Sequence, residues 1–123
     1  MVEPKEGGTY ELYFIPGNRE SMNTRGCTVT KIVPEKTLQF TWKGPDPFNS
    51  LMNRGHELTE VKVSLDAVGP TETKVSIEHS GFNRSKEWDE AFNWHQNAWT
   101  GVLSSLKSAI ETGEGELCCQ PNL

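Results

Sequence analysis

Two histidines are the side chains of this 123-residue sequence whose types and positions best suit hydrogen bonding or proton transfer near neutral pH. His79 ends the segment "TKVSIEHS", where it shares a two-residue period with Val75 and Ile77. His95 lies in "NWHQNAW", among residues that repeat with helical periodicity. Two alternatives follow: the imidazoles line one cavity and face a bound molecule, or each is a buried ring satisfied by a backbone carbonyl or water.

Strands must position His79, and they are predicted where apolar and polar residues alternate. This alternation covers residues 10–14, 27–33, 38–42, 59–67 and 73–82. Pro34 begins a turn after the second of these segments and "VGPTE" begins one after the fourth, so the sequence predicts two antiparallel hairpins. Residues 43–55 hold two prolines and two glycines and are expected to form a long surface connection.

A helix must position His95, and it is predicted near residues 86–111, with Ser85 as its cap and Gly113 just beyond its end. A helical projection places His95 inside one apolar stripe and Trp94 outside it. The stripe is expected to face inward, and its large members are Trp88, Phe92, Trp99, Leu103, Leu106 and Ile110.

Composition restricts the partners and the chemistry. The 17 acidic against 12 basic residues give a net charge of −5, which disfavours nucleic acid and anionic membrane surfaces. The three cysteines, Cys27, Cys118 and Cys119, form no disulfide framework or zinc motif, so we expect no metal and no cofactor. A cytoplasmic location is expected because the sequence begins without an apolar signal segment.

Several quoted segments together resemble one known family. They are "GGTYELYF", "GCTVTKIVPEKTLQFTW", "ELTEVKVSLDAVGPTETKVSIEHSGF" and "HQNAWTGVLSSLKSAIETG", and they occur in the family's order between Gly7 and Gly113. The chain resembles the domains similar to the activator of heat-shock-protein-90 ATPase, in the START-like (SRPBCC) helix-grip superfamily. This resemblance implies an α+β fold in which a curved antiparallel sheet of about six strands grips one long C-terminal helix, with a largely apolar cavity between them.

The resemblance also sets expectations about the extent of the domain. Residues 1–113 are expected to form a single helix-grip domain and residues 114–123 a flexible tail. The family's first strand and two short helices, about forty residues, have no counterpart before residue 7. Because exposed sheet edges and apolar patches tend to be covered by another chain, a homodimer is expected.

Three functions from different classes remain open at this stage. The favoured one is a module that binds a small apolar or aromatic ligand, and its expected wall residues are Phe40, Trp42, His79, His95 and Trp99. The second is an enzyme similar to the polyketide cyclases and aromatases of the superfamily, with the two histidines as acid–base groups. The third is a chaperone ATPase regulator or another protein-interaction module with a chaperone partner. We assign no catalytic residue, because one fold supports many functions.

Overall fold

The computed structural model describes residues 1–15, 17–53 and 58–114 of the chain. These residues belong to two compact units, one from Met1 to Phe82 and one that begins at Asn83. The first unit contains all the described strands, and the second contains the long helix. The mixture of antiparallel strands followed by one long C-terminal helix confirms the predicted α+β class and the element order of the helix-grip fold.

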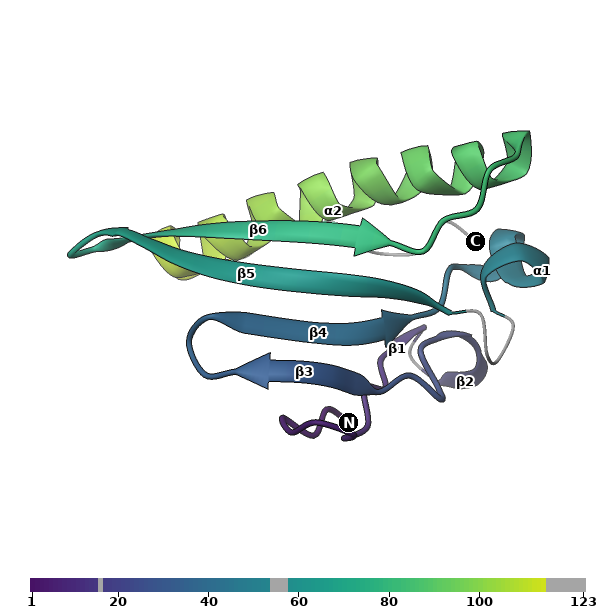
Figure 1. Ribbon diagram of the computed structural model, residues 1–123, viewed down its shortest axis with the longest axis horizontal. Helices are drawn as coiled ribbons and strands as arrows, with labels where there is room; N and C mark the ends of the chain where they lie inside the picture. The colour runs from purple at the N-terminus through teal and green to yellow at the C-terminus, as the bar shows by residue number, and fades with distance from the viewer. Residues whose placement is uncertain (16, 54–57, 115–123) are drawn as a thin grey trace. The chain divides into compact units, whose positions relative to one another are not determined.

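A four-stranded antiparallel sheet forms most of the first unit (Figure 1). Its strands, in sheet order, are β3 (Val29–Val33), β4 (Thr37–Trp42), β5 (Thr59–Gly69) and β6 (Glu72–Ser80). The two hairpins predicted from the alternation of residues are the pairs β3–β4 and β5–β6. Leu65 on β5 also donates its N–H to the Lys36 carbonyl in the β3–β4 turn, at 2.8 Å.

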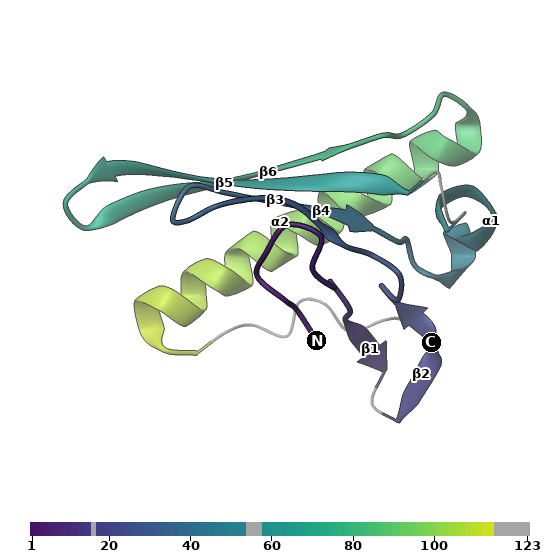
Figure 2. The ribbon, with the colours of Figure 1, turned by 60° about the horizontal axis from the view of Figure 1, so that its bottom comes forward.

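The strands that precede β3 form a separate two-stranded sheet, in which β1 (Tyr13–Ile15) pairs with β2 (Asn18–Asn23) (Figure 2). Sequence reasoning expected one strand over residues 10–14 and none over 18–23. The sequence of β2 gives no alternation of apolar residues, because asparagine, arginine, glutamate and serine fill most of it. Local polar bonds are present at its start: Asn18 Oδ1 accepts the N–H of Glu20 at 3.0 Å, and Asn18 Nδ2 donates to Ser21 Oγ at 3.1 Å.

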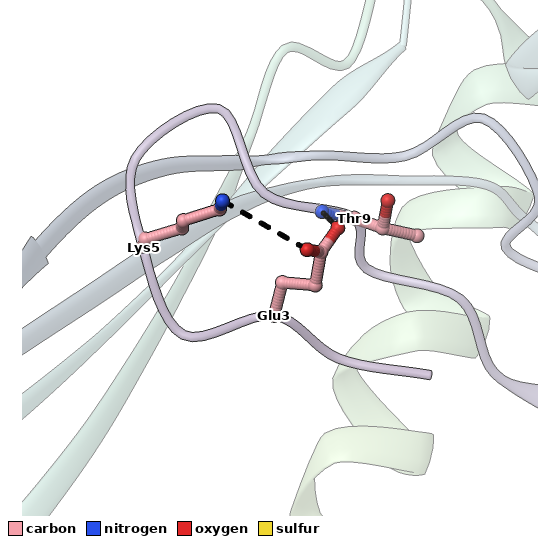
Figure 3. Close-up of polar contacts among 3 residues, drawn as sticks. All are labelled: Glu3, Lys5 and Thr9. Atoms are coloured by element: carbon pink, nitrogen blue, oxygen red, sulfur yellow. Dashed lines mark hydrogen bonds and ion pairs between the residues drawn. The ribbon is translucent and has the colours of Figure 1, made fainter.

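The N-terminal segment folds back alongside β3. Val2 forms a bridge with Tyr10, and Thr9 forms one with Thr28. Glu3 stabilises the turn between Val2 and Tyr10. Its Oε1 accepts the Thr9 N–H at 3.1 Å, and its Oε2 lies 4.0 Å from Lys5 Nζ (Figure 3). The hydrogen bonds from Thr9 lower the pKa of Glu3.

The connection between β4 and β5 contains two short helical segments, η1 (Asp46–Phe48) and α1 (Asn49–Met52). Met52 is fully buried and lies against Gly44, where an added Cβ would come within 2.5 Å of the Met52 sulfur. Asn53 closes the connection, since it accepts the Gly44 N–H at 2.8 Å and donates to the Gly44 carbonyl at 3.0 Å. Met52 therefore turns inward from this connection.

The second unit consists of α2 (Lys86–Thr112), whose bounds differ by one residue from the predicted helix. The Ser85 hydroxyl accepts the Trp88 N–H at 3.2 Å, which caps the first turn as expected. Gly113 ends the helix with a φ of 82°, in the left-handed region that glycine adopts without strain.

The burial of the α2 side chains agrees only in part with the predicted stripe. Trp88, Ala91 and His95 are buried, and Trp94 is 46% exposed, as expected. The expectation of an inward side chain was wrong for three members of the stripe, namely Phe92 (40% exposed), Leu106 (41%) and Ile110 (74%). Periodicity shows which side chains share a face of a helix, whereas burial also requires that this face be covered along its whole length.

Candidate functional site

The candidate site in the first unit lies on one face of β4, β5 and β6. Register pairs Phe40 with Val61 and Val61 with His79, while Trp42 pairs with Thr59. Directly paired residues project to the same face of a sheet, and so do residues two apart on one strand. Phe40, Trp42, Thr59, Val61 and His79 therefore share this face, and the first four of them are buried.

An aromatic cluster occupies the β4 part of this face. The Tyr10 ring stacks on the Phe40 ring with centroids 3.9 Å apart and planes 10° from parallel. Trp42 lies 6.0 Å from Phe40 and 6.2 Å from Phe14, in tilted and edge-on arrangements. Tilted and edge-on contacts such as those of Trp42 are favourable geometries for aromatic pairs, and the cluster is apolar.

A chain of hydrogen bonds connects this cluster to His79. The fully buried Thr59 hydroxyl donates to the Trp42 carbonyl at 3.4 Å and lies 2.8 Å from His79 Nε2. The 2.8 Å contact with His79 Nε2 admits either direction. With the hydroxyl proton directed to the Trp42 carbonyl, which can only accept, His79 Nε2 would donate to the Thr59 oxygen, which corresponds to the Nε2–H tautomer of a neutral ring. The Phe82 ring meets the imidazole edge-on, 4.7 Å away, and also fixes its orientation.

The opposite face of the same strands is polar. Glu60 accepts hydrogen bonds from Thr30 Oγ1 at 3.1 Å and from Gln39 Nε2 at 3.0 Å. These bonds hold the Glu60 carboxylate on the face away from His79. Glu57, a second carboxylate close to this strand end in the sequence, lies outside the described residues.

A phenol and a thiol lie beside the aromatic cluster. Burial raises the pKa of Tyr10 to about 12, and the nearby Cys27 adds to the increase. Burial likewise raises the pKa of Cys27, which is 1% exposed. Both groups therefore stay protonated at neutral pH, and Cys27 lacks the thiolate character that a nucleophile needs.

His95 is the buried polar residue of α2, with 2% exposure. Its Nδ1 donates to the Ala91 carbonyl one turn earlier, at 2.8 Å, so the proton of the neutral ring is on Nδ1 and the lone pair is on Nε2. Burial lowers the pKa of His95, and the bond to Ala91 opposes that change in part. The Trp94 ring lies edge-on at 4.8 Å. Trp99, one turn further along the helix, is half-buried.

Comparison with protein families identifies the chain at this point. Residues 1–111 match the family described as activator of Hsp90 ATPase homolog 1-like protein. The chain belongs to this family, and through it to the START-like (SRPBCC) superfamily. Comparisons with curated proteins and with solved structures return no significant match.

In this member of the family, the structure brings together three of the five predicted wall residues. Phe40, Trp42 and His79 share one face of the sheet, and Trp42 and His79 are connected through Thr59. His95 and Trp99 lie one turn apart on α2. That these two groups line a common cavity stays a prediction.

Two contributors to the candidate site were missed in the sequence. Thr59 has the same parity as Val61 and Val63, so alternation placed it on the correct face, but threonine at a strand start gave no sign of a bond to a histidine twenty residues away. Tyr10 was placed in a strand, but its stacking on Phe40 was not anticipated.

Among the described residues, no cluster of His, Cys, Asp and Glu side chains has the grouping that a metal ion needs. None of the helices described combines the length and apolar character required to cross a bilayer.

Proposed function

We propose that this protein binds a small apolar or aromatic molecule on the sheet face that carries Phe40, Trp42 and His79. The observation that supports this most is the Trp42–Thr59–His79 network, which fixes an imidazole beside large aromatic rings. Ligand sites commonly combine an apolar wall with a few precisely held polar groups. His95 and Trp99 are the proposed wall residues from α2.

The chemistry of the face indicates what kind of ligand it suits. The cluster of Tyr10, Phe14, Phe40 and Trp42 makes this part of the face apolar, which suits a ring or an aliphatic chain. The imidazoles of His79 and His95 are polar groups that can exchange a hydrogen bond with a ligand. The proposed ligand is therefore largely apolar and carries a polar group such as a phenolic hydroxyl.

Native mass spectrometry of the protein purified from its source, followed by titration with 1-naphthol as a defined probe, tests this proposal. We expect a co-purified small molecule or saturable naphthol binding, with chemical-shift changes at the rings of Trp42 and His79. Trp42→Leu should weaken binding about tenfold or more, through loss of ring contact. Lys62→Leu is the matched control, because Lys62 lies on the polar face of β5, and it should leave binding unchanged. Binding that is equally sensitive to both variants, or no saturable binding of the folded protein, would reject the sheet face as the site.

A cyclase-like enzyme is the second candidate, and the neutral state of His95 favours it. Burial lowers the pKa of this imidazole, so it stays unprotonated and able to accept a proton at neutral pH. Turnover of a small β-dicarbonyl probe, abolished in His95→Leu but retained in the exposed neighbouring variant Gln96→Leu, would support catalysis over simple binding. Probe binding without turnover would favour the binding module.

A chaperone regulator is the third candidate, because the matched family is described by activation of Hsp90 ATPase. Measurement of a chaperone's ATPase rate with and without this protein tests it. Stimulation that survives Trp42→Leu would separate this role from ligand binding on the sheet face.

A further inference from the structure

The chain just after β6 approaches the start of β5 closely at Gly81. Register pairs Glu60 with Ser80, the last residue of β6, so Gly81 follows opposite Thr59. A Cβ atom at Gly81 would lie 3.3 Å from Thr59 Cα and 3.8 Å from both Thr59 Cβ and the Glu60 nitrogen. Ordinary van der Waals contact begins at 3.4 Å, so a side chain at this position would displace Thr59.

Gly81 also turns the chain at this point. Its φ is 92°, in the left-handed region that glycine adopts without strain. The next residue, Phe82, then places its ring edge-on to His79, with centroids 4.7 Å apart. Gly81 is thus covalently next to one contact of His79, the Phe82 ring, and packed against another, Thr59, whose hydroxyl lies 2.8 Å from the imidazole.

We propose that Gly81 is a positioning residue, and that its missing Cβ sets the place of the Thr59 hydroxyl relative to the His79 imidazole. A hydrogen bond depends steeply on distance and angle. A displacement of Thr59 by a few tenths of an ångström therefore weakens the bond that holds the ring. The role of Gly81 in ligand binding rests on the proposed function, because His79 is the imidazole assigned to the ligand face.

Backbone strain and the close approach to Thr59 can be separated by substitution. Gly17 has a similar φ of 80°, but a Cβ atom there would meet nothing within 4 Å. Gly17→Ala therefore imposes backbone strain without a new contact, and it is the matched control for Gly81→Ala. Asparagine adopts a positive φ more readily than alanine does, so Gly81→Asn carries less strain and still has the Cβ atom.

Two measurements on these variants test the proposal: the ring nitrogen chemical shifts of His79 without ligand, and titration with 1-naphthol. We expect both Gly81 variants to move the His79 signals in the same direction as Thr59→Val does. Naphthol binding should weaken by about two- to tenfold, the range that corresponds to the loss of one hydrogen bond. Gly17→Ala should lose stability and keep the wild-type His79 signals and naphthol affinity. Gly81→Asn supplies the result if alanine at this position prevents folding.

The two readouts distinguish failure of the positioning role from failure of the proposed function. Wild-type His79 signals in folded Gly81→Asn would overturn the positioning role, and so would an equal change of those signals in Gly17→Ala. Either result, with saturable naphthol binding to wild type, leaves the proposed function standing. Perturbed His79 signals in both Gly81 variants, with no naphthol binding to wild type, would support the positioning of His79 and reject the proposed ligand.

Discussion

Removal of the Thr59 hydroxyl is the most direct perturbation of the candidate site. Thr59→Val keeps the shape of the side chain and deletes the oxygen that lies 2.8 Å from His79 Nε2 and 3.4 Å from the Trp42 carbonyl. The shorter bond contributes about 0.5–1.5 kcal/mol. The longer one exceeds the usual O–H···O range and contributes less. Since Thr59 is fully buried, loss of this partner also leaves a desolvation cost, and the total destabilisation is expected to be about 1–3 kcal/mol.

Chemical denaturation of a double-mutant cycle measures the part that belongs to the histidine. Thr59→Val, His79→Phe and the double variant should be non-additive by about 0.5 kcal/mol or more, because each single change removes the same bond. Thr73→Val, an exposed threonine on β6, is the matched control and should change stability by less than about 0.5 kcal/mol.

The tautomer of His79 provides an independent check. Nitrogen chemical shifts should show the proton on Nε2 in wild type and a mixture of tautomers in Thr59→Val. Additivity of the two single variants within about 0.3 kcal/mol, together with an unchanged tautomer, would refute the network as described.

Three further changes have predictable outcomes. Burial depresses the pKa of His95 below its ordinary value of 6.5, so the unfolded state takes up the proton first as the pH falls. The contribution of His95 to stability should therefore be complete above about pH 6.5 and decrease as the pH drops toward the folded pKa. Thermal melts should show a shallower decrease in His95→Leu, and an NMR pKa of His95 at or above about 6.5 would contradict this prediction. Glu35 adopts a φ of 63° in the β3–β4 turn, so Glu35→Gly should stabilise the protein by about 0.5–1 kcal/mol in urea titrations, whereas Lys36→Gly should not. Gly44→Ala should destabilise the protein by about 1–3 kcal/mol, since the new Cβ meets the buried Met52, and Gly44→Ala/Met52→Ala should lose less than the sum of its single variants.

The long helix and the hairpins could be predicted because their signals are local. Ser85 and Gly113 mark the ends of α2 by their capping chemistry, and both have the predicted roles. Pro34 marked the β3–β4 turn, in which the Lys36 N–H bonds to the Val33 carbonyl at 3.0 Å. Periodicity of two likewise placed Phe40 and Trp42 on one face of β4, and His79 on one face of β6 with Val75 and Ile77. Each of these inferences depends on residues within a few positions of one another.

The remaining features depend on residues distant in sequence or on polar bonds without a pattern. β2 was missed because its sequence, NRESMN, lacks the alternation of apolar and polar residues that marks a strand. Thr59 was missed because its partner, His79, is on another strand. The inward direction expected for Ile110 was wrong because a periodic pattern does not specify how far along a helix its apolar face is covered.

The two histidines differ in a way that the sequence pattern did not indicate. His79 is bonded through Nε2 to a neighbouring strand, and His95 through Nδ1 to its own helix. A neutral His95 therefore carries its proton on Nδ1, whereas a neutral His79 that donates to Thr59 would carry it on Nε2. Each ring orientation is held by a bond within its own unit, so a ligand does not have to order either ring. Polar groups held in this way lose little conformational entropy on binding, which is the property expected of a recognition site and equally of a preorganised proton acceptor.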